Sequence, residues 1–180
     1  MQVSQLPQLE IPSDLDLPVQ FFGFIIPSNV PNKYIMNLGT ELGVLSWDGE
    51  SSLASYEEIR QPDPTRPFPR YTILDGKVGP HGVLLFYIIP FPVGSALPVN
   101  PIPELTPANQ STLYGICGVK QKTLHSGYEL GNGIGFTRNG KWFYHNDIIP
   151  RMMYKSYWDQ ETCSISTYSV IFIIRCVGYT

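Results

Sequence analysis

An Asn-Gly pair between two runs of strand-forming residues constrains the fold of this chain more than any other feature. The pair is Asn139-Gly140, and the flanking runs are 133–138 and 141–145. Asn and Gly accept the two positive-φ positions of a type I′ turn, whose twist matches that of paired antiparallel strands. The sequence therefore predicts a β-hairpin here. Antiparallel hairpins linked by Gly and Asn turns are typical of sandwiches and barrels.

Proline content supports an all-β interpretation. The chain has 17 prolines in 180 residues, about twice the usual ~5%. Proline breaks helices and central strands alike, so these residues must separate many short segments. The length is that of one domain. We expect an extended or flexible arm over 1–19, which is polar and acidic, followed by a single antiparallel β-sandwich over 20–180.

About eight strands are predicted. The segment 82–89 is an unbroken apolar run, which alternation explains only if both faces of the strand are covered, so we expect it to be the central strand. Ser52 can cap one or two helical turns that would reach Ile59. The remaining predicted strands, beside the two hairpin arms, are 20–26, 43–47, 71–74, 113–119 and 167–176.

Two proline-rich connections stand out. The segment 61–70 contains four prolines, which exclude helix and favour an extended path over the surface. The segment 90–107 contains six prolines and one charged residue, Glu104. Such a long, stiff and weakly polar loop is expected either to pack on the body or to bind a partner.

The order of these segments resembles a SPRY domain, the β-sandwich core of B30.2 modules. The resemblance rests on Leu-Ser-Trp-Asp-Gly at 45–49, the proline-containing segment 60–69, the Gly-aromatic strand 82–87, the small-residue strand 113–119 and Phe-Thr-Arg-Asn-Gly at 136–140. It covers about 43–176 and implies a non-catalytic protein-interaction module. A viral jelly-roll or fibre-knob domain has the same proline-rich, aromatic character and remains the alternative, as a structural or receptor-binding domain that self-assembles.

Residues suited to catalysis or metal binding do not form a recognisable pattern. His81, His125 and His145 are far apart and none has a zinc-ligand spacing, so no metal and no cofactor are expected. There is no Gly-x-Ser-x-Gly motif to expose a nucleophile. The sequence therefore predicts a protein that is not an enzyme. A carbohydrate-binding or hydrolytic β protein would require two suitably spaced carboxylates, which sequence alone does not place.

Charge and cysteine content indicate a reduced, intracellular protein. Twelve basic and fifteen acidic residues leave a net charge of −3 without a basic run, so nucleic acid is not an expected partner. The first thirty residues lack the pattern of a secretory signal, and no apolar stretch is long enough for membrane insertion. The three cysteines, 117, 163 and 176, are widely spaced and are expected to be reduced and buried. A cytoplasmic location follows, or the virion under the alternative.

A protein or peptide partner is the remaining prediction, with a homo-oligomer as a further possibility. The segment 152–160 is rich in Met, Tyr and Trp, which are enriched where proteins dock. If it is a loop, Tyr154, Tyr157 and Trp158 are its anchors; the same residues could instead cap the core. Arg60 and Arg66 flank the first proline-rich connection and are candidates for contacts with an acidic peptide.

Overall fold

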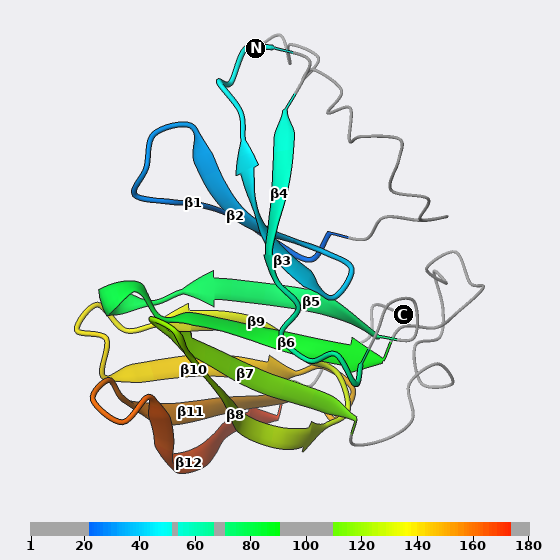
Figure 1. Cartoon of the computed structure of the whole chain (residues 1–180). Helices are drawn as coiled ribbons and strands as arrows, with labels where there is room; N and C mark the ends of the chain where they lie inside the picture. Colours follow the sequence, from blue (N-terminus) through cyan, green and yellow to red (C-terminus); the bar gives the residue numbers. More distant parts are fainter. Residues whose placement is uncertain (1–21, 52–53, 67–70, 91–109, 174–180) are drawn as a thin grey trace, which may run out of the picture.

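Three four-stranded antiparallel sheets make up the part of the chain that the computed structural model describes, residues 22–51, 54–66, 71–90 and 110–173 (Figure 1). In each sheet the strands follow one another in sequence order, so each sheet is a simple meander. The first sheet contains β1 (Ile25–Pro27), β2 (Lys33–Leu38), β3 (Glu41–Ser46) and β4 (Ser55–Arg60). The second contains β5 (Tyr71–Val78), β6 (Leu84–Pro90), β7 (Ser111–Cys117) and β8 (Lys120–Tyr128). The third contains β9 (Gly131–Phe136), β10 (Trp142–Asp147), β11 (Met152–Asp159) and β12 (Ser164–Ile173).

The second sheet lies between the other two and is covered on both faces. Along β6, Phe86 and Ile88 belong to the apolar cluster shared with the first sheet, which contains Leu42. The alternate residue Tyr87 belongs to the cluster shared with the third sheet, which contains Phe143. Successive side chains of a strand point to opposite faces, so one strand supplies both clusters. The predicted central strand over 82–89 is confirmed.

Asn37 ties the first sheet to the second through its buried side-chain amide. Its Oδ1 accepts hydrogen bonds from the backbone N–H groups of Gly23 and Phe24, at 2.8 and 3.0 Å. Its Nδ2 donates to the carbonyl oxygens of Gly39 and Ile73, both at 3.1 Å. A buried amide with all these bonds satisfied is stable, whereas a buried polar group without partners costs roughly 1–3 kcal/mol. The amide therefore holds β1, β2 and β5 in one arrangement.

The predicted hairpin is present, but its turn differs from the prediction. Strands β9 and β10 pair antiparallel around residues 137–140. The Gly140 N–H donates to the Thr137 carbonyl at 2.8 Å, and only Gly140 has a positive φ, +69°. Asn139 instead uses its side chain, whose Oδ1 accepts from the Lys141 N–H at 3.1 Å. The turn is thus a type I turn closed by a left-handed glycine, a common longer hairpin connection.

Two further local predictions are wrong. The helical turns expected after Ser52 are not found, because the chain from Ser55 forms β4 and pairs with β3, with Ser55 opposite Ser46. The segment 152–160 is not a loop, because β11 occupies Met152–Asp159 between β10 and β12. In both places pairing with a neighbouring strand overrides a weak local pattern. The expected arm over 1–19 and most of the connection over 90–107 lie outside the described residues.

A disulfide joins the second and third sheets, which corrects the expectation of reduced thiols. Cys117 follows the buried part of β7, and Cys163 lies in the turn between β11 and β12, 46 residues further along the chain. Their Cα atoms are 6.2 Å apart, within the range that a disulfide spans. Wide spacing in the sequence gave no sign of this pairing, because the sheets bring the two residues together.

Candidate functional site

The aromatic residues predicted as binding anchors lie on two faces of the third sheet. Tyr154 and Trp158 are buried in the cluster between the second and third sheets. Tyr157 points to the opposite face, where it makes an edge-to-face contact with Trp142 at a centroid distance of 5.2 Å. Burial explains Tyr154 and Trp158 without any partner, and Tyr157 alone is placed where a partner could reach it.

Both candidate arginines make contacts within the chain. Arg60 donates to the carbonyl oxygen of Val119 at 3.4 Å. Arg66 donates to the Gln110 carbonyl at 2.8 Å, and its Nε lies 3.5 Å from a carboxylate oxygen of Asp63. These contacts fasten the connection between the first two sheets onto the second. A role in binding a partner remains a prediction for Arg60, Arg66 and Tyr157.

The first strands of the three sheets gather along one side of the molecule, which we call the inner edge. Strand β5 lies beside both β1 and β9 (Figure 1). Bulges interrupt two of the strand pairs there, between Ile73 and Asp75 in β5 and between His145 and Asn146 in β10. Bulges often re-aim side chains beside functional sites. The polar residues at these bulges are therefore candidates for a site.

Asp75 is the carboxylate of this edge. Burial raises the pKa of its carboxyl group, while hydrogen bonds from the backbone of Gly76, Gly133 and Ile134 and the charge of Lys77 act in the opposite direction. The bonds to Gly133 and Ile134 cross from the second sheet to the third. A half-buried carboxyl with a raised pKa is better suited to accept and return a proton near neutral pH than an ordinary exposed one.

Two asparagines continue the polar edge onto the third sheet. Asn132 pairs with Asn146 across β9 and β10. The Asn132 Oδ1 accepts from the Gly133 N–H at 2.8 Å, which fixes the amide and leaves its nitrogen to donate elsewhere. Gly133 has φ +71°, and a Cβ there would lie 2.7 Å from the Asn146 Nδ2, so glycine is required for this close approach. The Asn146 Oδ1 is buried and has no hydrogen-bond partner among the described residues.

A second polar group, His145 with Tyr87 and Ser156, is closed to substrate. The Tyr87 hydroxyl lies 2.7 Å from His145 Nδ1, and the Ser156 Oγ lies 3.1 Å from Nε2. All three side chains are fully buried between the second and third sheets. Burial, and to a smaller extent the charge of His125, lower the pKa of His145 to about 3. The imidazole is therefore neutral, and the group is a buried hydrogen-bonded network rather than a nucleophile and its base.

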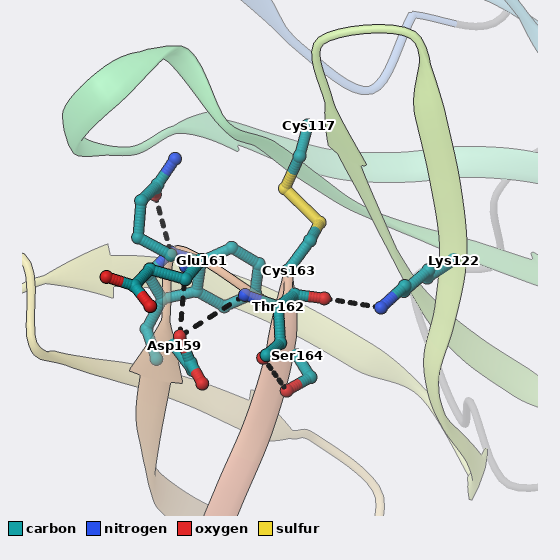
Figure 2. The surroundings of a disulfide bond; sticks show 9 residues. Cys117, Lys122, Asp159, Glu161, Thr162, Cys163 and Ser164 are labelled. Carbon is teal, nitrogen blue, oxygen red and sulfur yellow. Dashed lines mark hydrogen bonds between the residues drawn. A yellow bond between two sulfur atoms is a disulfide. The ribbon is translucent and has the colours of Figure 1, made fainter.

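A polar hollow of about 620 Å³ lies over the disulfide. Figure 2 shows Lys122 donating to the carbonyl oxygen of Thr162, next to the Cys117–Cys163 bond. Asp159 accepts from the backbone N–H groups of Glu161 and Thr162, at 2.9 and 3.3 Å. The charged groups of this hollow thus serve the turn that carries Cys163.

Metal-binding side chains are sparse in the described ranges. No group of three or more His, Cys, Asp or Glu residues that could hold a metal ion occurs there. Calcium takes six to eight oxygen ligands. Among the described residues, the inner edge offers oxygen ligands from the Asp75 carboxylate and from the amides of Asn132 and Asn146. Nor does any helix in this part of the chain have the length and apolarity to span a membrane.

No protein-family model and no curated protein matches this sequence. Solved structures do match. A luciferin-regenerating enzyme has a TM-score of 0.69 and 26% identity, over 86% of this chain and 48% of its own. Regucalcin, a calcium-binding protein from Agrobacterium tumefaciens, has a TM-score of 0.58 and 15% identity, over 81% of this chain and 43% of its own. A proposed 6-phosphogluconolactonase from Bacteroides uniformis has a TM-score of 0.51 and 10% identity, over 93% of this chain and 46% of its own.

These similarities correct the sequence-based assignment. The chain spans about half the length of the structures it matches. Their fold is of the six-bladed propeller type, in which each blade is a four-stranded antiparallel sheet, as are the three sheets here. The SPRY resemblance is therefore wrong. The predictions of a non-catalytic interaction module, of a viral structural domain and of no enzymatic activity are also wrong. The matched structures include a luciferin-regenerating enzyme and a proposed 6-phosphogluconolactonase, and these names indicate enzymes.

The physical reason for the error is that strand content and turn chemistry are common to many antiparallel folds. A Phe-Thr-Arg-Asn-Gly hairpin and a Gly-aromatic strand fit a sandwich and a propeller blade equally well. The order of strands in the sheets separates the two, and sequence spacing does not reveal it. Sequence reasoning also missed Asp75 and Asn132. The available signals were the glycines beside them, Gly76 and Gly133, which leave room for the Phe24 ring and the Asn146 side chain at the inner edge.

Proposed function

We propose that this chain forms part of a propeller-type enzyme that hydrolyses a small cyclic ester, a lactone, at the inner edge. The observation that carries the proposal is the similarity to a luciferin-regenerating enzyme, at 26% identity over 86% of this chain. The lactone follows from the name of a second matched structure, a proposed 6-phosphogluconolactonase. Propeller blades surround a central channel, and the first strands of the three sheets lie together on one side here.

Asp75 and Asn132 have the properties that this reaction needs. Water attacks the ester carbonyl carbon, the bond from that carbon to the ring oxygen breaks, and a hydroxy acid results. A carboxylate can take the proton from water and return it to the leaving oxygen. An amide N–H directed at the carbonyl oxygen stabilises the negative charge that develops there. Asp75 fits the first role through its raised pKa, and Asn132 the second through its fixed amide.

The test is a lactone-hydrolysis assay with the full 180-residue chain, read as acid release by a pH indicator across sugar lactones and simple aliphatic lactones. Asp75→Asn should reduce turnover by about 10²-fold or more, the usual size of a general-base contribution. Asn132→Ala should reduce turnover with little change in KM. Asp48→Asn and Asn139→Ala, in exposed turns, are the matched controls.

Folding of each variant is checked by circular dichroism, because Asp75 also bonds the backbone of the third sheet. Absence of turnover on every lactone by the folded chain would contradict the proposed reaction. Unchanged turnover in folded Asp75→Asn would remove Asp75 from it.

A further inference from the structure

Two hairpin turns meet at the outer edges of the second and third sheets, at the ends of these sheets away from the inner edge. Strands β8 and β12 are the last strands in the order of their sheets, and they lie side by side. Cys117 lies where β7 turns into β8, and Cys163 lies in the turn from β11 to β12. The disulfide therefore joins two turn regions, and such regions open more readily than central strands.

The bond borders a hollow in the surface. Both cysteines line the polar hollow of about 620 Å³ over the disulfide. Cys117 is half-buried, whereas Cys163 is only 3% exposed. A thiol that breaks a disulfide must reach one of its two sulfur atoms, so access helps to set the rate of exchange. The hollow therefore gives a small thiol a path to the Cys117 side of the bond.

Cys163 has a backbone conformation that few residues other than glycine adopt. Its φ is +50°, in the left-handed region, where a side chain crowds the backbone. In short hairpin turns a left-handed position is usually occupied by glycine. The bond to Cys117 therefore holds Cys163 against the preference of its own backbone, and opening the bond does not deprive the turn of a favourable residue.

The turn that carries Cys163 is also held by hydrogen bonds that do not involve sulfur. The Lys122 ammonium group, from β8, donates to the Thr162 carbonyl oxygen (Figure 2). The Asp159 carboxylate accepts from the N–H groups of Glu161 and Thr162. These bonds do not depend on the disulfide, so they keep the two sulfur atoms close together when it is broken. Closing the bond is then an intramolecular step at high effective concentration.

We propose that the Cys117–Cys163 bond is a redox-sensitive switch, which a dithiol reductant opens in the folded protein and a disulfide oxidant closes again. Opening frees the two turns from each other. The buried cluster between the second and third sheets and the hydrogen bonds of Asp75 at the inner edge remain in place.

The exchange proceeds in two steps. A thiolate of the reductant bonds to the sulfur of Cys117, and Cys163 leaves as a thiolate and takes up a proton. The second thiol of the reductant then displaces Cys117, which takes that thiol's proton, so the reductant becomes a cyclic disulfide and both cysteines become thiols. In closing, the disulfide oxidant takes up the electron pair and leaves as two thiols.

Thiol trapping with mass spectrometry measures the switch under native conditions. The 180-residue chain with Cys176→Ser, in which this pair alone can exchange, is treated with dithiothreitol, blocked with a maleimide and digested. Cys117 and Cys163 should both be labelled while circular dichroism still shows a folded protein. Replacing the reductant by oxidised glutathione should restore the bond. Resistance to dithiothreitol until the protein unfolds would overturn the proposal, and so would a folded, reduced protein that does not close again.

Lys122→Met tests how the open form is kept ready to close. Losing the bond to the Thr162 carbonyl loosens the turn, so the bond should re-form at least about threefold more slowly. Lys120→Met removes the same charge from the lining of the same hollow and is the matched control, with an unchanged closing rate expected. Equal slowing in both variants would show that charge, rather than a turn held in place, controls closure, and would overturn this part of the proposal.

Cys163→Gly provides a permanently open form. Glycine adopts φ +50° freely, so this variant should be more stable than Cys163→Ser, which loses the same bond. Its hydrogen exchange should match that of the reduced protein, faster at the turns 117–120 and 159–164 and unchanged in β5 and β9. Faster exchange throughout both sheets would identify a purely structural bond and overturn the switch. The inference does not depend on the proposed lactone reaction, because thiol labelling and lactone turnover are separate readouts.

Discussion

The first and second sheets have the same strand order, but they differ in how many of their faces pack against a neighbouring sheet. The second sheet has a neighbour on each face, and every residue of β6 is buried. Among the described strands, the first sheet has a neighbouring sheet on one face only, and most of β4 is exposed. An identical meander thus tolerates an unbroken apolar run in one place and a charged strand in another. The number of covered faces, rather than the topology, determines the composition of a strand.

The largest expected difference between the two sheets is the cost of truncating an isoleucine. Ile88 is fully buried in β6, whereas Ile59 in β4 is 55% exposed. Ile88→Ala should lower the free energy of unfolding by about 2–5 kcal/mol, through lost burial and the cavity left behind. Ile59→Ala should change it by less than about 0.5 kcal/mol. Urea unfolding followed by circular dichroism measures both. Equal costs would show that β4 is also covered in solution.

The second prediction compares two junctions. The first junction lies between the first and second sheets, and the second junction lies between the second and third sheets. The junction of the second and third sheets is closed by the Cys117–Cys163 bond, and the described part of the first junction has no disulfide. Replacing both cysteines by serine should lower the free energy of unfolding by about 2–4 kcal/mol, the usual effect of a disulfide.

Thiol counting provides the control for this prediction. The chain has three cysteines, so the unfolded, unreduced protein should show one reactive thiol, Cys176, whereas three would show that the bond is absent. Disulfides persist in oxidising compartments. The intracellular location expected from the sequence stays a prediction, and the same count on protein isolated from cells tests it.

Acid should weaken the second junction more than the first. His145 has a pKa of about 3 in the folded chain, against an ordinary 6.5 when unfolded. Between these values the unfolded chain binds the extra proton, so stability is complete above pH 6.5 and is lost as the pH falls toward 3. The slope is at most about 1.4 kcal/mol per pH unit. The buried polar residues Asn37 and Thr72 at the junction of the first and second sheets do not titrate.

The measurement is unfolding free energy from pH 7 to pH 4, with hydrogen exchange to locate the loss. His145→Gln should flatten the slope that the histidine contributes. If the variant keeps the full slope, another group is responsible for the acid sensitivity.

The sequence predicted the all-β, antiparallel class, the central strand at 82–89 and the hairpin around Asn139-Gly140. These features depend on local turn chemistry and on the burial of a single strand. Both can be recognised in the sequence, from turn residues and from an apolar run. The assembly of strands into successive meanders could not be predicted, because Gly turns join strands equally well in sandwiches and propellers. The disulfide could not be predicted for the same reason, because only the arrangement of the sheets brings Cys117 beside Cys163.

The residues of the candidate site were harder to predict from the sequence than the fold was. Asp75 looks like a turn residue in the sequence, because it precedes Gly76, and only the register with β6 shows that it lies at a bulge. Asn132 looks like part of a flexible glycine run. Their proximity depends on the packing of β5 beside β9. The sequence analysis instead predicted binding anchors among the aromatic residues of β11, such as Trp158. A large buried side chain and an exposed anchor have the same sequence signature.

The smallest prediction concerns the hairpin turn, which contacts the second sheet. Gly140 has φ +69°, and a Cβ added there would lie 2.8 Å from the ring of Pro80, in the turn before β6. Gly140→Ala should therefore lower the free energy of unfolding by about 1 kcal/mol or more, since alanine is strained at positive φ and the proline must also move.

Gly135→Ala, in the adjacent strand β9, meets no atom within 4 Å and is the matched control. Alanine there restricts the unfolded chain and should be neutral or slightly stabilising. Thermal unfolding of the two variants ranks them. Equal stability would mean that the turn does not hold its left-handed glycine, and that its contact with Pro80 does not stabilise the packing of the third sheet on the second.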